Sequence, residues 1–521
     1  MFANKTVLYY TLIVSMGGFI FGFDASVISG AVGFVTTEFS LTAWQQGFVV
    51  SSPTLGGIIA TITAGAICDA FGRRKTLIII AFLYLISALA SALAVDYWML
   101  IIARFIGGMA FCSLMIAPIY IAEISPAEHR GKMVSVNQFN IVLGFSVSYF
   151  SNFYFLQLSQ SDLAWVVQLG IEDNVWRWML GMEIIPALLW FVLLFTIPRS
   201  PRWLIMKGYE QEADSVLRKI FDSHQVVQQI ESIKASMSEQ KSTLTNGLKL
   251  LFSNRMKWPI FIGLIVGIAQ QITGINVIFF YAPTIFEQSG VGTNAAFMQA
   301  VFIGVVNVIF TIVAMITIDK FGRKPLLIIG LSGVILSMSI CAYGFKQASY
   351  ILTPEQVVQL AAEHDDLKVE QFTHMQGQTF NSDVEFKQAL QQNINEQTYN
   401  KHQGQLLEQA TNINATLILV GIIGFVASFA MSLGPVMWVM FSEIFPNQIR
   451  GLAISLVGVV NSAVSFLVQL VFPWELATLG AAMTFLIYGI CAAIGLVLVM
   501  RFLPETKGKS LEEVERSFAR I

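Results

Sequence analysis

Charged residues are scarce in this sequence. Only 12% of the 521 residues are charged, whereas soluble globular domains carry about 25%. The 31 Lys and Arg residues are balanced by 33 Asp and Glu residues, which leaves no basic excess to hold a nucleic-acid backbone. The low charge argues against a soluble enzyme, and the balance excludes a nucleic-acid partner.

Cysteine and histidine are scarce as well. The four cysteines stand singly inside apolar runs, so none is paired for a metal site or a redox dithiol. All five histidines lie outside those runs, and the sequence has no Gly-rich phosphate loop ending in Lys-Ser/Thr. We therefore expect no enzymatic activity, no metal, no cofactor and no use of ATP.

Long apolar runs are abundant, because 55% of the residues are hydrophobic. A membrane-spanning helix needs about 20 such residues. The sequence therefore predicts an all-α membrane protein with twelve transmembrane helices in two six-helix halves. The expected spans are 8–34, 46–68, 77–94, 98–122, 133–156 and 177–197, then 258–286, 296–318, 326–345, 414–441, 452–473 and 478–502.

The distribution of Lys and Arg predicts the orientation. They gather at the N-terminus and in the even-numbered short loops, for example at Arg73 and Arg323, and are absent from the odd-numbered short loops. By the positive-inside rule, both termini are cytoplasmic. The expected parts are an N-terminal half (1–197), a cytoplasmic helical linker (198–257), a C-terminal half (258–503) with a long extracytoplasmic loop (346–413), and a cytoplasmic tail (504–521).

The long loop 346–413 is rich in Gln and polar throughout. Its three histidines, His364, His374 and His402, are too scattered for a metal site. A folded cap over the entrance and a disordered loop are both compatible with this composition.

Two short motifs occur once in each half, which supports an internal repeat. An Asp followed four residues later by Arg comes after the second and eighth spans, and a Glu followed seven residues later by Arg comes after the fourth and tenth. These charges could simply reflect the general excess of basic residues in cytoplasmic loops. Their repetition at matched helix ends in both halves instead favours a gate, which opens and closes as one half rocks against the other. The expected cytoplasmic gate residues are Asp69, Arg73, Glu123, Arg130, Asp319, Arg323, Glu443 and Arg450.

Three ionisable residues lie inside predicted spans of the first half: Asp24, Arg104 and Glu183. Each costs on the order of 2.5–3.5 kcal/mol in the membrane if it is unpaired. Counted from the outer ends at about 1.5 Å per residue, the three reach similar depths, so contact is plausible. They predict either a static ion pair that serves packing or a proton switch, in which protonation of Asp24 releases Arg104 toward Glu183.

Several amide side chains also lie inside spans. Amides offer donors and acceptors to a neutral polyol, and an aromatic ring offers a flat face to its C–H surface. A single residue of this kind in a membrane helix more often forms a hydrogen bond to a neighbouring helix or serves packing. Gly274, and Gly434 with Pro435, predict breaks in helices seven and ten. The candidate ligand-binding residues are Gln138, Gln270, Gln271, Asn276, Asn307, Trp438 and Asn461.

The motifs together resemble those of the sugar porters of the major facilitator superfamily, and most closely its bacterial proton-coupled branch. They include Gly22-Phe23-Asp24, both repeated loop motifs, Pro198-Arg199-Ser200-Pro201-Arg202-Trp203, Gln270-Gln271 with Asn276, and Pro504-Glu505-Thr506. This resemblance implies the major facilitator fold, alternating access, coupling by Asp24, Arg104 and Glu183, and sugar contacts by the amides and Trp438. It also implies that Phe279 and Tyr281 close the outer side.

The sequence therefore predicts import of a monosaccharide by proton symport, with the proton as the only coupling ion. Ser462, Leu433 and Phe145 depart from the pattern of known carriers and leave a pentose or a hexose, such as xylose, glucose or galactose, open. A facilitative sugar uniporter and a proton-coupled myo-inositol transporter are the alternatives. We expect a monomer in the lipid bilayer of a bacterial inner membrane.

Overall fold

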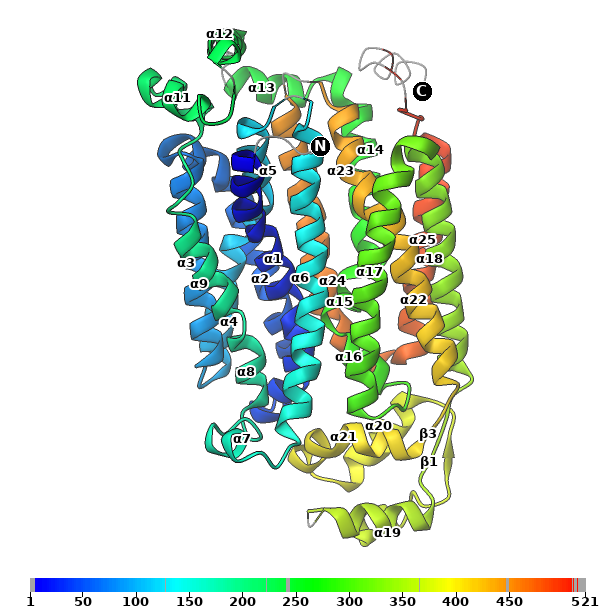
Figure 1. Ribbon diagram of the computed structural model, residues 1–521. Coiled ribbons are helices and arrows are strands. Elements are labelled where there is room, and N and C mark those ends of the chain that lie inside the picture. Colours follow the sequence, from blue (N-terminus) through cyan, green and yellow to red (C-terminus); the bar gives the residue numbers. More distant parts are fainter. Residues whose placement is uncertain are drawn as a thin grey trace.

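A computed structural model describes residues 5–126, 128–221, 223–239, 244–364, 366–446, 449–507, 509 and 513. Within these residues, twelve helical spans are long and apolar enough to cross a membrane. They run side by side along one axis (Figure 1). The predicted twelve-helix, all-α architecture is confirmed. We call the end that carries the N-terminus the inner end, and the opposite end the outer end.

The N-terminal half holds six spans, two of them interrupted. The straight spans are α1 (Lys5–Glu38), α2 (Ala43–Phe71), α3 (Arg73–Ala92) and α6 (Arg130–Ser159). The fourth span joins α4 (Tyr97–Met109), η1 (Ala110–Cys112) and α5 (Ser113–Ile124), and the sixth joins α8 (Val175–Gly181) and α9 (Ile184–Leu193), with the short outer helix α7 (Ala164–Gln168) before it.

The C-terminal half repeats this plan. Its uninterrupted spans are α17 (Thr293–Phe321), α18 (Arg323–Lys346), α24 (Arg450–Thr478) and α25 (Gly480–Phe502). The seventh span divides into α14 (Lys257–Ile272) and α15 (Ile275–Phe280), followed by α16 (Ala282–Glu287), and the tenth divides into α22 (Ala415–Met431) and α23 (Leu433–Ile444).

The linker between the halves lies at the inner end (Figure 1). It consists of α10 (Pro201–Met206), α11 (Glu210–Leu217), α12 (Ser223–Glu239), α13 (Leu244–Leu251) and η2 (Asn254–Met256). Trp203 ties it to the first half, because its indole N–H donates to the carbonyl oxygen of Asp69 at 3.1 Å. Most of the predicted tail 504–521 lies outside the described residues.

A glycine with positive φ makes the sharp turn at the repeated Asp-containing motif of each half. Gly72 (φ 84°) separates α2 from α3, and Gly322 (φ 91°) separates α17 from α18. An L-residue with a side chain rarely adopts this conformation. The same backbone turn therefore sets the two copies of the motif at equivalent places at the inner end.

The loop 346–413 is a folded cap at the outer end, which decides between the two alternatives that its composition left open (Figure 1). Strands β1 (Ser349–Ile351), β2 (Thr379–Phe380) and β3 (Thr411–Asn412) form an antiparallel sheet in the order β2-β1-β3. Helices α19 (Pro354–Glu363), α20 (Asp383–Asn393) and α21 (Glu396–Ala410), with η3 (Val369–Phe372), complete it. Buried side chains including Tyr350, Phe372 and Phe386 give the cap a core of its own.

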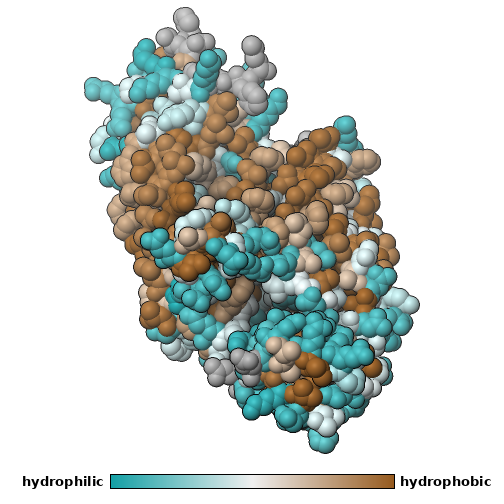
Figure 2. Space-filling model, turned by 60° about the horizontal axis from the view of Figure 1, so that its bottom comes forward, coloured by the Kyte–Doolittle hydropathy of each residue, from teal (hydrophilic) through white to brown (hydrophobic). Residues whose placement is uncertain are grey.

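The flanks of the molecule are hydrophobic and its outer end is hydrophilic (Figure 2). The two halves meet along two long helix pairs, because α2 packs against α24 and α6 packs against α17. Between these pairs, α1 of the first half packs against α15 and α16 of the second. The candidate site consists of one group of residues within each half.

Candidate functional site

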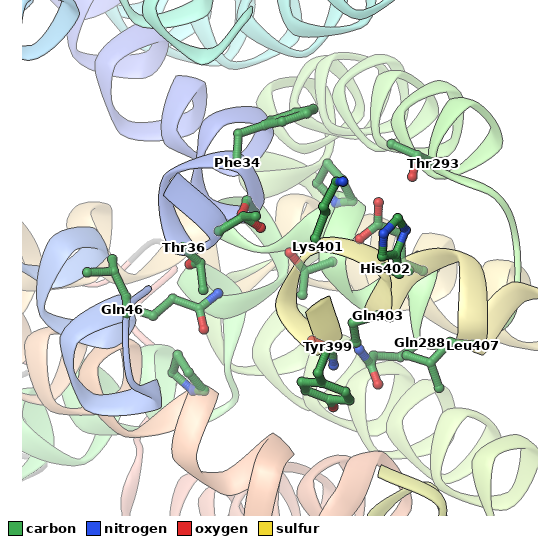
Figure 3. Close-up of a pocket in the computed structure, with 18 of the residues that line it drawn as sticks. Phe34, Thr36, Gln46, Gln288, Thr293, Tyr399, Lys401, His402, Gln403 and Leu407 are labelled. Atoms are coloured by element: carbon green, nitrogen blue, oxygen red, sulfur yellow. The ribbon is translucent and has the colours of Figure 1, made fainter. Parts of the chain in front are cut away.

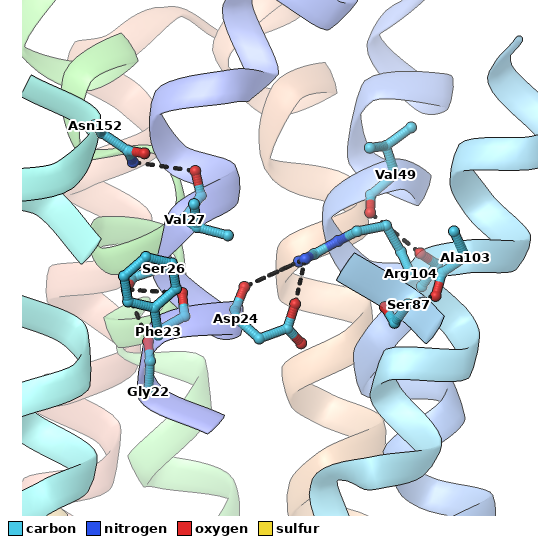
Figure 4. Close-up of polar contacts among 11 residues, drawn as sticks. Gly22, Phe23, Asp24, Ser26, Val27, Val49, Ser87, Ala103, Arg104 and Asn152 are labelled. Atoms are coloured by element: carbon cyan, nitrogen blue, oxygen red, sulfur yellow. Dashed lines mark hydrogen bonds and ion pairs between the residues drawn. The ribbon is translucent and has the colours of Figure 1, made fainter. Parts of the chain in front are cut away.

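Asp24 and Arg104 form a buried ion pair in the first half (Figure 4). The Arg104 guanidinium Nη1 lies 2.6 Å from Asp24 Oδ1, and the side chains are only 2% and 1% exposed. The guanidinium also donates to the carbonyl oxygen of Asp24. The predicted contact between Asp24 on α1 and Arg104 on α4 is therefore present as an ion pair.

Close helix packing places Asp24. A Cβ atom on Gly22 would lie 2.0 Å from the carbonyl oxygen of Ile141, and one on Gly144 would lie 2.0 Å from that of Phe19. Only glycine allows the backbones of α1 and α6 to approach this closely. One face of α1 is thus held against α6, while Asp24 reaches the other way, toward Arg104 (Figure 4).

Glu183 completes the group of three. It lies in the turn that separates α8 from α9, is 2% exposed, and its carboxyl group faces that of Asp24 within hydrogen-bonding reach. Among the described residues, Asp24 Oδ2 and Glu183 Oε1 receive no hydrogen bond from a donor. The structure thus brings together all three predicted charges, in an arrangement of two carboxyl groups and one guanidinium.

Four of the predicted amides form one hydrogen-bonded cluster between α14, α15 and α24. Gln271 Nε2 donates to Asn461 Oδ1 at 3.2 Å, and Asn276 Nδ2 donates to Gln271 Oε1 at 2.9 Å. Asn461 Nδ2 donates to Gln270 Oε1 at 2.9 Å. Gln270, Gln271 and Asn461 each both donate and accept, and Asn276 donates, which is bonding that a polyol hydroxyl can replace.

The predicted break at Gly274 is confirmed, and it makes this cluster possible. On a straight helix, Gln271 and Asn276 would point about 140° apart. Gly274 adopts a left-handed conformation (φ 87°), with α14 ending before it and α15 beginning after it. The break turns Asn276 toward Gln271. The second predicted break is also present, but at Ser432, just before Gly434 and Pro435.

Sequence analysis missed two members of the cluster on α24. Ser465 Oγ accepts from Asn276 Nδ2 at 2.6 Å, and Gln469 Nε2 donates to Ser465 Oγ at 2.7 Å. Both side chains are buried. The spacing of Asn461, Ser465 and Gln469 at four-residue intervals places them on one helix face and could have revealed them.

Three predicted sugar contacts lie outside this cluster. Gln138 on α6 and Trp438 on α23 are exposed, and Asn307 on α17 is buried. Within the described part of the chain, none of these three side chains forms a hydrogen bond. Trp438 packs edge-on against Phe441, with ring centroids 5.9 Å apart. Their role in binding stays a prediction.

The outer side of the cluster is closed by aromatic residues. The Phe279 ring lies 5.0 Å from that of Phe145 on α6, and Tyr149 Oη donates to the Phe279 carbonyl oxygen at 2.6 Å. Tyr281 Oη donates to the carbonyl oxygen of Gln469 at 3.2 Å. The contacts of α15 with α6 and α24 therefore separate the amides from the outer end, as expected for Phe279 and Tyr281.

At the inner end, the repeated motifs pair their charges within each half. Arg73 contacts Glu123 at 3.0 Å and Asp69 at 3.2 Å. In the other half, Arg323 contacts Glu443 at 2.7 Å. The bonds thus join the helix after the first motif to the helix before the second, in both copies.

The remaining gate residues behave differently. Arg130 is exposed, and Arg450 donates to the carbonyl oxygen of Phe445 at 3.3 Å, so neither is ion-paired to a carboxylate within the described residues. The side chain of Asp319 lies outside the described part. Hydroxyls that sequence analysis did not assign to the gate take part instead. Ser200 donates to Glu123 at 2.5 Å, and Thr506 donates to Glu443 at 2.6 Å.

Glu505 anchors the chain after the twelfth span. Its carboxylate accepts from the backbone N–H groups of Arg323 at 3.1 Å and Lys324 at 3.0 Å. Burial alone would raise the pKa of Glu505, but these bonds and those from Lys507 and Thr506 lower it below its ordinary value. The carboxylate therefore remains charged and holds the start of α18.

We expect Arg73→Gln to lower the stability of the protein by about 1–3 kcal/mol, because Glu123 would lose its counter-charge in a place where it is only 8% exposed. Thermal unfolding in detergent measures the change. Lys75→Gln, on the same helix but at an exposed position, is the matched control. Equal melting temperatures for the two variants would contradict a stabilising role for the Arg73 network.

Comparison with known proteins finds the same architecture. The sugar (and other) transporter family matches residues 10–358 and 401–518. The D-xylose-proton symporter of Escherichia coli strain K12 is 34% identical over 98% of this chain and 96% of its own length. The arabinose-proton symporter of Bacillus subtilis is 32% identical over 98% and 94%. An inward-open structure of the E. coli xylose transporter XylE superposes with a TM-score of 0.73, at 31% identity over 98% of this chain and 99% of that one.

Proposed function

This chain belongs to the sugar porter family of the major facilitator superfamily, and from that membership and its site we propose that it imports a monosaccharide together with a proton. The observation that carries the proposal is that one molecule contains both a buried charged group, Asp24, Arg104 and Glu183, in its first half and the amide cluster in its second half. One group would bind the proton and the other the sugar. The closed outer side and the two-half fold supply alternating access.

The charged group suits proton coupling because it holds two carboxyl groups for one guanidinium. Like charges this close do not both ionise, so a proton between Asp24 and Glu183 stabilises the arrangement. Protonation of Asp24 cancels its attraction to Arg104, and the guanidinium then shifts toward Glu183. A move of Arg104 alters the contact between α1 and α4, which is how the proton biases one conformation over the other.

The amide cluster suits a neutral sugar. In the absence of a ligand, its members satisfy one another, and a polyol ring can exchange these bonds for its own hydroxyls at little cost. We assign sugar contacts to Gln270, Gln271, Asn276 and Asn461, and we extend the set to Ser465. Gln138, Asn307 and Trp438 would join as the halves close around the sugar.

Relatives carry names that specify D-xylose and arabinose, which makes a pentose the first sugar to test. We further propose a plasma-membrane location with both termini in the cytoplasm, so that the outer end faces outside. The protein would act as a monomer, with no cofactor, no metal and no catalytic activity. Asp69, Arg73, Glu123, Arg323 and Glu443 would lock the inner end in one of its states, with Arg130, Asp319 and Arg450 as the remaining members of the predicted gate.

The test is sugar-induced proton movement in proteoliposomes. Xylose, arabinose, glucose, galactose and myo-inositol are added in turn while internal pH and sugar uptake are followed. We expect one of the monosaccharides to enter and to acidify the interior. Entry without acidification would establish a uniporter, and acidification with myo-inositol alone would establish the polyol transporter.

A further inference from the structure

A large cavity lies at the outer end, between the cap and the aromatic residues that close the outer side of the amide cluster. Its volume is about 1120 Å³. Figure 3 shows residues of the N-terminal half, among them Phe34 and Gln46, on one side and cap residues such as Tyr399 and Gln403 on the other. Tyr281 also lines it. We call this cavity the vestibule.

The cap is held firmly over the vestibule. Lys387 on α20 is buried, and its ammonium group donates to Gln288 Oε1 at 2.6 Å and to Asp383 Oδ2 at 3.1 Å. Gln288 directly follows α16, so this bond ties the cap to the outer part of the seventh span. Within the cap itself, His402 and Lys401 on α21 both lie 2.9 Å from Asp366 and join two segments of the cap to each other. Their hydrogen bonds hold the pKa of Asp366 well below its ordinary value.

Lys387, Lys401 and Glu38 at the wall are ion-paired, whereas Glu172 and Asp173 are exposed carboxylates without an ion pair among the described residues, so the wall has no surplus positive charge that would favour an anion over a neutral ligand. Lys387 and Lys401 have the carboxylate partners just described. Glu38 lies 2.7 Å from Arg177. Burial raises the pKa of Glu287 to about 7. A hydrogen bond with Thr293 lowers this pKa in part, and the nearby charge of Glu408 raises it further. Below that pH, Glu287 is mostly uncharged.

Unpaired amides line the vestibule from both sides. Gln46 comes from α2, Gln388 and Gln391 from α20, and Gln403 from α21. In the part of the chain that the structure describes, none of these four side-chain amides has a hydrogen-bond partner. The wall therefore offers the same kinds of donors and acceptors as the amide cluster. The aromatic rings of Phe34 and Tyr399 also line the vestibule. This is the composition of a site for a polyol ring.

We propose that the vestibule is a second, outer binding site for a neutral monosaccharide. It would hold the sugar on the outer side of the aromatic residues that cover the amide cluster, until that side opens. The floor is the layer of Tyr281 and Phe472, whose rings lie 4.9 Å apart and which separates the two sites. The family match covers residues 10–358 and 401–518, so Gln388, Gln391 and Tyr399 lie outside the matched ranges. The identity of the sugar rests on the proposed function, but occupancy of the vestibule does not.

Protection of an introduced thiol tests the proposal locally. Gln391→Cys places a thiol on the vestibule wall, and Gln392→Cys places one on the neighbouring exposed residue that does not line it. Alkylation by a membrane-impermeant maleimide is timed in proteoliposomes with D-xylose, D-glucose or myo-inositol, against potassium chloride of equal osmolarity. Both variants are also made with Gln271→Ala, which weakens the amide cluster.

We expect one of these sugars to slow alkylation at Gln391→Cys about twofold at a concentration equal to its Kd, in both backgrounds, and to leave Gln392→Cys unaffected. Adding Gln403→Ala should remove the protection. Protection that disappears with Gln271→Ala would come from the amide cluster through a conformational change and would overturn the proposal, as would no protection by any sugar. Protection by one of these sugars in a protein that transports none of the sugars tested would refute the proposed function while supporting the vestibule site.

Discussion

Replacing Asp24 with Asn is expected to abolish uphill accumulation of sugar. Wild-type protein that couples one proton to one sugar gains about 2.3 kcal/mol from a membrane potential of 100 mV, enough for roughly 40-fold accumulation. The Asp24→Asn variant should only equilibrate the sugar, at a ratio of about one. Asn still accepts a hydrogen bond from Arg104, so the buried guanidinium retains a partner, but the side chain no longer takes up a proton.

Two assays on the same proteoliposomes separate coupling from transport. Sugar exchange between equal internal and external concentrations needs no net proton movement, and we expect it to survive in Asp24→Asn. Accumulation under an imposed potential should be lost. Asp162→Asn, an exposed acid in an outer loop, should keep both activities. If the Asp24→Asn variant still concentrates the sugar, Asp24 does not couple the proton, and its ion pair with Arg104 serves only helix packing.

Replacing Gln271 with Ala is expected to raise the KM for sugar about 10–100-fold, since each buried polar group left without a partner costs roughly 1–3 kcal/mol. Gln271 is the centre of the amide cluster. It donates to Gln270 and Asn461 and accepts from Asn276. Its loss therefore removes a direct sugar contact and releases the neighbours that would orient the other hydroxyls.

Initial rates of uptake across a range of sugar concentrations measure this effect. Gln347→Ala, an exposed amide at the outer end of α18, is the control and should leave KM unchanged. The melting temperature of each variant distinguishes loss of binding from loss of structure. An unchanged KM in Gln271→Ala would assign the cluster to helix packing, the usual role of single amides in membrane helices.

The position of Glu183 illustrates how far sequence analysis reached. Its burial and its approach to Asp24 and Arg104 could be predicted, because isolated charges in apolar spans need partners. The break between α8 and α9 that carries it was not predicted, although Gly181 ends α8 and Pro186, which cannot donate to the carbonyl four residues before it, stands at the start of α9. Gly274 is the opposite case, because the residue type that permits a left-handed turn is visible in the sequence and the break was predicted.

The gate residues show the same limit. The repeat of two motifs located Arg73 with Glu123 and Arg323 with Glu443, but spacing alone did not say which charges meet. Arg130 and Arg450 follow Glu123 and Glu443 in sequence, yet the glutamates face the arginines of the other motif. Pairing depends on which helix ends pack together, and that is set by contacts between spans far apart in the chain.

The sequence by itself determined the membrane class, the twelve spans, the two-half plan and the residues capable of proton and sugar chemistry. Composition, run length and residue type suffice for these, because burial in lipid penalises every unpaired charge and every unpaired backbone group locally. The tertiary structure alone decided that the loop 346–413 is a cap, that Asn276 reaches Ser465 on α24, and that four unpaired glutamines surround a vestibule. Each of these depends on side chains from distant segments meeting in space, and local sequence does not encode such distances.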